Sequence, residues 1–167
     1  MRGEALALVL WASAAQAVER DPDAPRWSVG VPVEVDLVGL AAGVHPELLF
    51  RPAAPDGALH LRFAVGVMAG PELALVPFSL GIRGVAAPRR MVRPFAGIGT
   101  QLQVFAPYGV PARARLDLYL ELGLDVRVAE GWRVGAQFSP EFGMYPGFGL
   151  GMAVRAGFQV DLGRSRG

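Results

Sequence analysis

The sequence predicts an all-β fold in which eight antiparallel strands, joined in order, close into an up-and-down barrel. Three observations predict this fold. Apolar residues alternate with polar residues or glycine through most of the chain, segments rich in glycine and proline separate the alternating runs, and no helical segment interrupts them. The eight runs cover residues 27–37, 42–51, 59–67, 76–83, 92–104, 115–128, 132–142 and 148–162.

The first four runs each have one apolar face, because successive side chains of a strand point to opposite sides. Residues 27–37 place Trp, Val and Leu opposite Ser, Gly, Pro, Glu and Asp. Residues 42–51 place Ala, Val, Leu and Phe opposite Gly, His, Glu and Arg. Residues 59–67 set Leu, Phe and Val against His, Arg, Ala and Gly, and residues 76–83 set Val, Phe, Leu and Ile against Ser, Gly and Arg.

The last four runs follow the same rule. Residues 92–104 place Val, Ala, Ile and Leu opposite Arg, Gly and Gln. In residues 115–128, RLDLYLELGLDVRV, every even position is Leu or Val, and every odd position is charged, Tyr or Gly. Residues 132–142 set Trp, Val, Ala and Phe against Arg, Gly, Gln, Ser and Glu, and residues 148–162 set Phe, Leu, Met and Val against Gly, Arg, Gln and Asp. At helical spacing these side chains would scatter around the axis, so the pattern favours strands.

Residues that favour turns stand between the runs. They are Pro52–Gly57, Gly70–Pro71, Ala86–Arg90, Pro107–Pro111, Glu130–Gly131 and Tyr145–Gly147. An even number of hairpin-linked strands can close without an exposed edge, and eight is the strand number of the smallest such barrels. Because proline donates no ladder hydrogen bond, we expect shorter strands or bulges at some prolines inside or near the runs. These are Pro32, Pro46, Pro77, Pro94 and Pro140.

Composition excludes several classes of protein. The 167 residues are enough for one domain, and the absence of cysteine excludes disulfides and thiolate chemistry. A net charge of +1 argues against binding to nucleic acid. Although 52% of the residues are hydrophobic, no apolar run beyond the N-terminal stretch reaches the roughly 18 residues that a spanning helix needs.

The N-terminus has the pattern of a secretory signal peptide. Ala5–Ala15 is an apolar stretch in which Ser13 is the one polar residue, and Ala15-Gln16-Ala17 matches an A-x-A cleavage site. We therefore expect a signal peptide at residues 1–17, an N-terminal segment at 18–25, a barrel at 26–163 and a polar tail at 164–167. A retained membrane anchor is the alternative, although the stretch is short for one.

The alternation alone fits two kinds of barrel: a soluble one with its apolar face inside, or a membrane-spanning one with its apolar face against lipid. Glycines on the polar face favour the second, since small residues make room for long ones inside a tight eight-stranded barrel. These glycines are Gly66, Gly81, Gly97, Gly99, Gly123, Gly135, Gly149, Gly151 and Gly157. Aromatic residues near both ends also match interfacial girdles. They are Trp27, Phe50 and Trp132 at one end, and Phe142, Tyr145 and Phe148 at the other.

In a membrane barrel the polar face becomes the interior, where charges require partners. Arginine presents a planar fork that suits carboxylates, and the polar face carries matched sets of both signs. The predicted polar network of the lumen is Glu34, Asp36, Glu47, Arg62, Arg83, Arg93, Arg115, Asp117, Tyr119, Glu121, Asp125, Arg127, Arg133, Glu141, Arg155 and Asp161. An ordinary solvated face of mixed charge is the alternative interpretation.

Two segments, His45–Pro52 (HPELLFRP) and Val92–Gly99 (VRPFAGIG), look like segments of uncharacterised outer-membrane barrels. With the signal peptide, the strand count and the alternation, they make residues 26–163 resemble the small eight-stranded outer-membrane β-barrels of Gram-negative bacteria. The resemblance implies an outer-membrane location, contact with outer-membrane lipid and insertion by the outer-membrane assembly machinery. The chain departs from the family in its short turns and in ending on a polar tail rather than an aromatic residue.

Few residues suggest chemistry. His45 and His60 share the polar face with Glu47, which permits a metal or catalytic site, but a buried hydrogen-bonded role is the plainer explanation. Ser139 and Glu141 approach the rim, where the resemblance places the catalytic residues of some lipid-modifying barrels, yet no histidine accompanies them. We expect no catalytic residue, no metal, no cofactor and no nucleic-acid partner.

The sequence therefore predicts a non-enzymatic integral outer-membrane barrel with a charge-paired, plugged lumen and a structural, adhesive or narrow-conduit role. A soluble exported barrel that binds an apolar ligand is the second hypothesis. A lipid-modifying hydrolase that depends on Ser139, Glu141 or His45 is the third. The physiological role, any ligand and the oligomeric state do not follow from the sequence.

Overall fold

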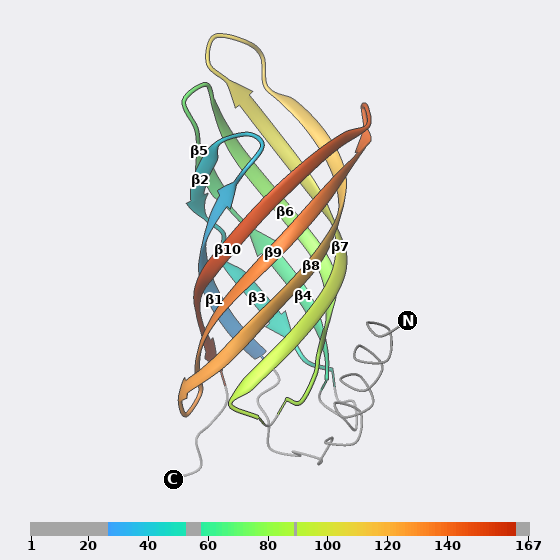
Figure 1. Ribbon diagram of the computed structural model, residues 1–167. Helices are drawn as coiled ribbons and strands as arrows, with labels where there is room; N and C mark the ends of the chain where they lie inside the picture. The colour runs from blue at the N-terminus through green and yellow to red at the C-terminus, as the bar shows by residue number, and fades with distance from the viewer. Residues whose placement is uncertain (1–26, 53–57, 89, 163–167) are drawn as a thin grey trace, which may run out of the picture.

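The computed structural model describes residues 27–52, 58–88 and 90–162. Within these residues the chain forms a tall barrel of tilted strands (Figure 1). The predicted signal peptide (1–17), N-terminal segment (18–25) and polar tail (164–167) lie outside the described residues, so they stay predictions.

Ten strands form the described barrel, and all neighbours pair antiparallel. They are β1 (Trp27–Asp36), β2 (Ala41–Val44), β3 (Glu47–Phe50), β4 (Leu59–Val65), β5 (Val67–Ala69), β6 (Leu73–Val85), β7 (Val92–Pro107), β8 (Arg113–Ala129), β9 (Trp132–Tyr145) and β10 (Gly149–Asp161). β2 and β3 share one position in the wall, as do β4 and β5, which leaves eight positions. Pairing of β1 with β10 closes the sheet. The predicted eight-stranded antiparallel up-and-down barrel is confirmed.

Two wall positions are interrupted, and the sequence indicates only one of the interruptions. Pro46 separates β2 from β3, as expected for a residue that cannot donate to the ladder. The second break, at Gly66, was not predicted. A Cβ atom there would lie 2.9 Å from Pro77 Cγ and 3.2 Å from the His45 ring. The position therefore has little room for a side chain, and glycine fits between the segments that carry Pro77 and His45. The Gly66 amide donates to the Pro77 carbonyl at 2.8 Å.

The other prolines lie within continuous strands. They are Pro32 in β1, Pro77 in β6, Pro94 in β7 and Pro140 in β9. The ladder between β8 and β9 is nevertheless interrupted at Pro140, because the residue pair Tyr119–Glu141 is followed directly by the pair Leu122–Phe138. Several strands also extend beyond their predicted ranges: β6 begins at residue 73, β7 ends at 107, β8 covers 113–129 and β9 ends at 145.

The apolar face of the wall is on the outside. Along β8, Leu120, Leu122 and Leu124 are 38–57% exposed, whereas Asp117 and Glu121 are at most 1% exposed. An apolar hollow of about 590 Å³ also lies on the outer surface, across β3, β4, β6 and β7. The second hypothesis, a soluble carrier, places the apolar residues inside the barrel, and that placement is wrong.

The two ends of the barrel differ in their connections (Figure 1). We call the end where β1 begins and β10 ends the terminal end. It carries the connections from β3 to β4, from β6 to β7 and from β8 to β9. The opposite, distal end carries the turns at residues 37–40, 70–72, 108–112 and 146–148.

Candidate functional site in the polar lumen

The middle of the lumen holds two arginines and two glutamates, which we call the central layer: Arg62, Arg83, Glu47 and Glu121. Arg62 Nε donates to Glu47 Oε2 at 2.8 Å, and Arg83 Nε donates to Glu121 Oε1 at 2.7 Å. Arg83 Nη2 lies 3.4 Å from Glu47 Oε2, and Arg62 Nε lies 3.7 Å from Glu121 Oε2. All four residues are at most 8% exposed. Each charge therefore meets two of the opposite sign, and the layer is neutral.

Glycines make the central layer possible. Gly97 stands between Arg83 and Glu121 in the ladder, and the Glu121 side chain lies across the space that a Cβ of Gly97 would occupy. Gly81 and Gly99 likewise stand between Arg62 and Tyr119, whose ring lies over both glycines. Arg62 Nη1 donates to the Tyr119 hydroxyl at 3.1 Å. Glycines on the polar face thus let long side chains meet across one or two intervening strands.

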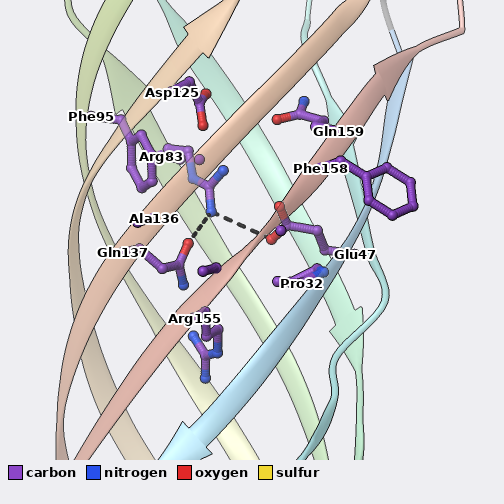
Figure 2. Close-up of a pocket in the computed structure, with 13 residues that line it drawn as sticks. Pro32, Glu47, Arg83, Phe95, Asp125, Ala136, Gln137, Arg155, Phe158 and Gln159 are labelled. Atoms are coloured by element: carbon purple, nitrogen blue, oxygen red, sulfur yellow. Dashed lines mark hydrogen bonds and ion pairs between the residues drawn. The ribbon is translucent and has the colours of Figure 1, made fainter.

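Arg83 has two further partners beside the central layer (Figure 2). Its Nη2 donates to Gln137 Oε1 at 2.9 Å, and its Cζ lies 4.2 Å from the centre of the Phe95 ring. A guanidinium stacks well on an aromatic face while its fork binds carboxylates. Phe95 was not predicted in the lumen, although it occupies a polar-face position two residues from both Arg93 and Gly97.

A second layer, on the distal side of the central layer, is organised by Arg155. Its Nη2 donates to Glu34 Oε1 at 2.9 Å and its Nη1 to Ser139 Oγ at 3.2 Å. Glu141 Oε1 lies 3.6 Å from the same guanidinium. This layer joins β1, β9 and β10 across the lumen.

Glu34, His45 and Ser79 stand in line within this second layer. Glu34 Oε2 contacts His45 Nδ1, and His45 Nε2 lies 3.4 Å from Ser79 Oγ. An acid, a histidine and a serine in line also form the triad of a hydrolase. Here all three are buried, and the Ser79 hydroxyl donates to Gln101 Oε1 at 2.7 Å. The three side chains and Gln101 therefore form one buried hydrogen-bond network.

The structure does not assemble the set named by the hydrolase hypothesis. Ser139 accepts a hydrogen bond from Arg155, and within the described residues no hydrogen bond joins it to His45. His60 lies at the terminal end, opposite Arg83 in the ladder. The described part of the chain contains no group of three His, Cys, Asp or Glu residues that could hold a metal ion.

Near the distal end, Arg115 Nε lies 2.7 Å from Asp117 Oδ1, and its Nη2 donates to Gln103 Oε1 at 3.2 Å. Gln103 Nε2 donates to Glu141 Oε2 at 2.8 Å, which links this pair to the second layer. Beside these polar groups, apolar side chains fill the lumen. They are Ala41, Met68 and Leu75, packed with Leu73 and Phe105.

The terminal end of the lumen holds two further ion pairs. Arg93 Nη2 donates to Asp125 Oδ2 at 3.0 Å, and Arg133 Nη2 contacts Asp161 Oδ1. Ser28 Oγ donates to the same Asp161 oxygen at 2.8 Å. These pairs link β7 to β8, β9 to β10 and β10 to β1.

Two predicted members lie outside the buried network. Asp36 is half-buried at the end of β1, where Oδ1 accepts hydrogen bonds from the amides of Val38 and Gly39, both at 2.9 Å. It therefore stabilises the first distal turn. Arg127 is exposed, because β8 has nearly reached the terminal end there and the lumen no longer encloses the side chain.

Four glutamines belong to the lumen although the prediction named none of them: Gln101, Gln103, Gln137 and Gln159. All are at most 8% exposed and occupy the same face as the predicted charges. The sequence does indicate their position, because each glutamine alternates in phase with the charged residues of its strand. A rule that included every polar residue on that face, rather than the charged ones and Tyr119 alone, finds them.

A small cavity lies between the central layer and the terminal end, beside β9 and β10 (Figure 2). Its volume is about 30 Å³, and its lining includes Glu47, Arg83, Asp125, Gln137 and Gln159. A water molecule needs roughly 10–15 Å³ by this measure, so the cavity has room for water and not for a solute.

No helix among the described residues is long and apolar enough to cross a membrane. No protein-family model matches the chain, and no curated protein matches its sequence.

Solved structures do match the barrel. Neisserial surface protein A (NspA) has a TM-score of 0.58 at 12% identity, covering 81% of this chain and 94% of that chain. The outer membrane protein OprG from Pseudomonas aeruginosa has a TM-score of 0.54 at 10% identity, covering 85% and 98%. A de novo designed transmembrane β-barrel has a TM-score of 0.58 at 13% identity, covering 86% and 100%.

The fold is that of a small transmembrane β-barrel. This agrees with the predicted resemblance to small outer-membrane barrels. At these identities the likeness shows the fold alone. A designed barrel matches as well as a natural one, so the fold does not define an activity.

Proposed function

We propose that the chain is a non-enzymatic integral protein of the bacterial outer membrane, with a plugged lumen and a structural role. The central layer carries the proposal, because side chains from β3, β4, β6 and β8 meet there across the whole interior. The apolar outer face supports contact with lipid. The outer-membrane location of barrels with this fold agrees with the proposal.

The plug consists of several barriers in series. The ion pairs of the terminal end, the central layer, the Arg155 layer and the distal apolar cluster follow one another along the axis. An eight-stranded barrel has an interior just wide enough for side chains to fill. Short turns offer little surface for adhesion, so a structural role is favoured over an adhesive role.

Electrical recording from planar lipid bilayers tests the plug. We expect purified full-length protein to insert without stepwise conductance, because the charged side chains of the central layer meet across the interior. A variant with both Glu47→Ala and Arg83→Ala removes a carboxylate and a guanidinium from that layer and should produce brief openings. The matched control Arg115→Ala alters a partly exposed distal pair and should stay silent.

The migration of unheated samples in gel electrophoresis reports whether each variant has folded, since folded barrels of this kind migrate differently before and after heating. Stepwise conductance of the folded wild-type protein would show a conduit and contradict the plug. Protein that stays monodisperse without detergent would contradict membrane integration itself.

A further inference from the structure

The two ends of the barrel differ in the chemistry of their turns. At the distal end, every turn except residues 70–72 exposes large apolar side chains. These side chains are Leu37, Val38, Leu40, Tyr108, Val110 and Phe148, and Phe148 is 83% exposed. Glu72 is the single charged residue among these four turns. At the terminal end, by contrast, the exposed residues of the connections include the charged Arg90 and Glu130 beside the apolar Met91.

The apolar outer wall runs into the distal turns without a polar interval. Leu150 follows Phe148 on β10, and Met144 and Tyr145 end β9, all of them exposed. The one exposed cation nearby is Arg113 at the start of β8, among the described residues of this end. A long arginine side chain can keep its charge at the level of lipid headgroups while its stem lies against apolar groups.

The height of the wall indicates what covers this surface. The outward face of β8 is apolar from Ala114 to Val128. At about 3.3 Å per residue and a tilt of about 40°, that run spans about 35 Å along the axis. The apolar band of an outer-membrane barrel is about 25 Å tall. About 10 Å of apolar wall therefore extends beyond an ordinary band.

The terminal end fixes where the surplus lies. Trp27 packs on Phe50 with ring centres 4.5 Å apart, and Trp132 packs near Phe158 at 6.1 Å. Exposed tryptophans of this kind mark the boundary between lipid and water. With that boundary at the terminal end, the surplus apolar surface lies at the distal end.

We propose that the distal turns lie in the boundary between lipid headgroups and acyl chains, instead of projecting into water. The occupant of this surface is membrane lipid, because the surface continues the lipid-facing wall and has almost no charge. Interfacial segments bury their apolar faces about 5–10 Å deep in this boundary, which matches the surplus height. This inference rests on the proposed membrane integration, and it makes the distal end a lipid-contacting surface.

Site-directed spin labelling tests the depth of the turns, and the absence of cysteine in the chain makes single labels unambiguous. Full-length Phe148→Cys and Tyr108→Cys variants, labelled and folded into dimyristoyl phosphatidylcholine vesicles, place probes in two distal turns. Leu122→Cys places a probe on the outer wall, and Glu130→Cys is the matched turn at the terminal end. Collision with apolar oxygen and with a water-soluble nickel chelate is then compared by electron paramagnetic resonance.

We expect oxygen to be the stronger relaxant at Phe148, Tyr108 and Leu122, and the nickel chelate to be stronger at Glu130. If Leu122 favours oxygen while both distal probes favour nickel, the inference fails and membrane integration stands. If Leu122 also favours nickel, the proposed function fails. Dipolar broadening between distal probes that disappears on dilution with unlabelled protein would show a second copy on this surface and would overturn the lipid assignment.

Discussion

Replacement of Arg83 tests whether the central layer is held by its charge balance. Arg83→Met removes a cation that donates to Glu121 through Nε at 2.7 Å and Nη2 at 3.3 Å. Glu47 and Glu121 then share Arg62 alone, so the buried layer acquires a net charge of −1. Removal of one partner from a buried ion pair costs about 3–5 kcal/mol. We expect the free energy of unfolding to fall by about 4 kcal/mol.

Glu121→Gln leaves Arg62 and Arg83 with Glu47 alone, a net charge of +1, and should lower the free energy of unfolding by about 3 kcal/mol. The double variant is neutral again and keeps the 2.8 Å contact between Arg62 and Glu47. Its loss should be about 4–5 kcal/mol and not the additive value of about 7 kcal/mol. The coupling energy is then about 2–3 kcal/mol, within the range for residues that share one network.

Guanidinium unfolding of protein in phosphatidylcholine vesicles, followed by tryptophan fluorescence and gel migration, gives each free energy by linear extrapolation. The matched control cycle, Arg127→Met with Glu130→Gln, changes two exposed charges near the terminal end and should give small, additive effects. If the losses for Arg83→Met and Glu121→Gln add in the double variant, the two residues are not coupled. The reasoning about a neutral layer would then be refuted.

Two more substitutions test the wall and the glycines. Leu122→Arg places a charge on the outer face and should lower the free energy of unfolding in vesicles by about 2–4 kcal/mol if it lies near the bilayer midplane. Leu122→Met is the matched control. An unchanged free energy of unfolding for the arginine variant would mean that water surrounds the wall. Gly99→Val brings a side chain against the Tyr119 ring and the Leu80 carbonyl, so the folded gel band should be strongly reduced. Gly147→Val enters open space and should fold normally, and equal yields of the two variants would contradict the packing argument.

The faces of the strands were predictable because the alternation of side chains is a local property of extended backbone. Residues 115–128 show this most clearly, since each predicted outward Leu or Val lies outside and Asp117, Tyr119, Glu121 and Asp125 are buried. Arg127 breaks the rule for a reason that no local pattern contains. Arg127 occupies a position of β8 on the same face as the lumen residues, but the barrel ends before its side chain is enclosed.

The pairs within the lumen were not predictable from parity. Arg83 meets Glu121 because β7 presents Gly97 between them, and this requires the registers of two hairpins at once. Phe95 fills a polar-face position because its ring lies over Gly123 on β8 and takes up the space that a side chain there would need. The hydrogen-bond chain from Glu34 through His45 to Ser79 likewise joins β1, the β2–β3 break and β6.

The sequence by itself determined the number of wall positions, their order and which side chains of each strand share a face, because the two-residue period and the turn residues act over neighbouring positions. Only the closed barrel decided which charge meets which, and where Gly66 breaks the wall. Closure sets the height of each residue along the axis through the register and tilt of all eight wall positions together. No single strand carries that information.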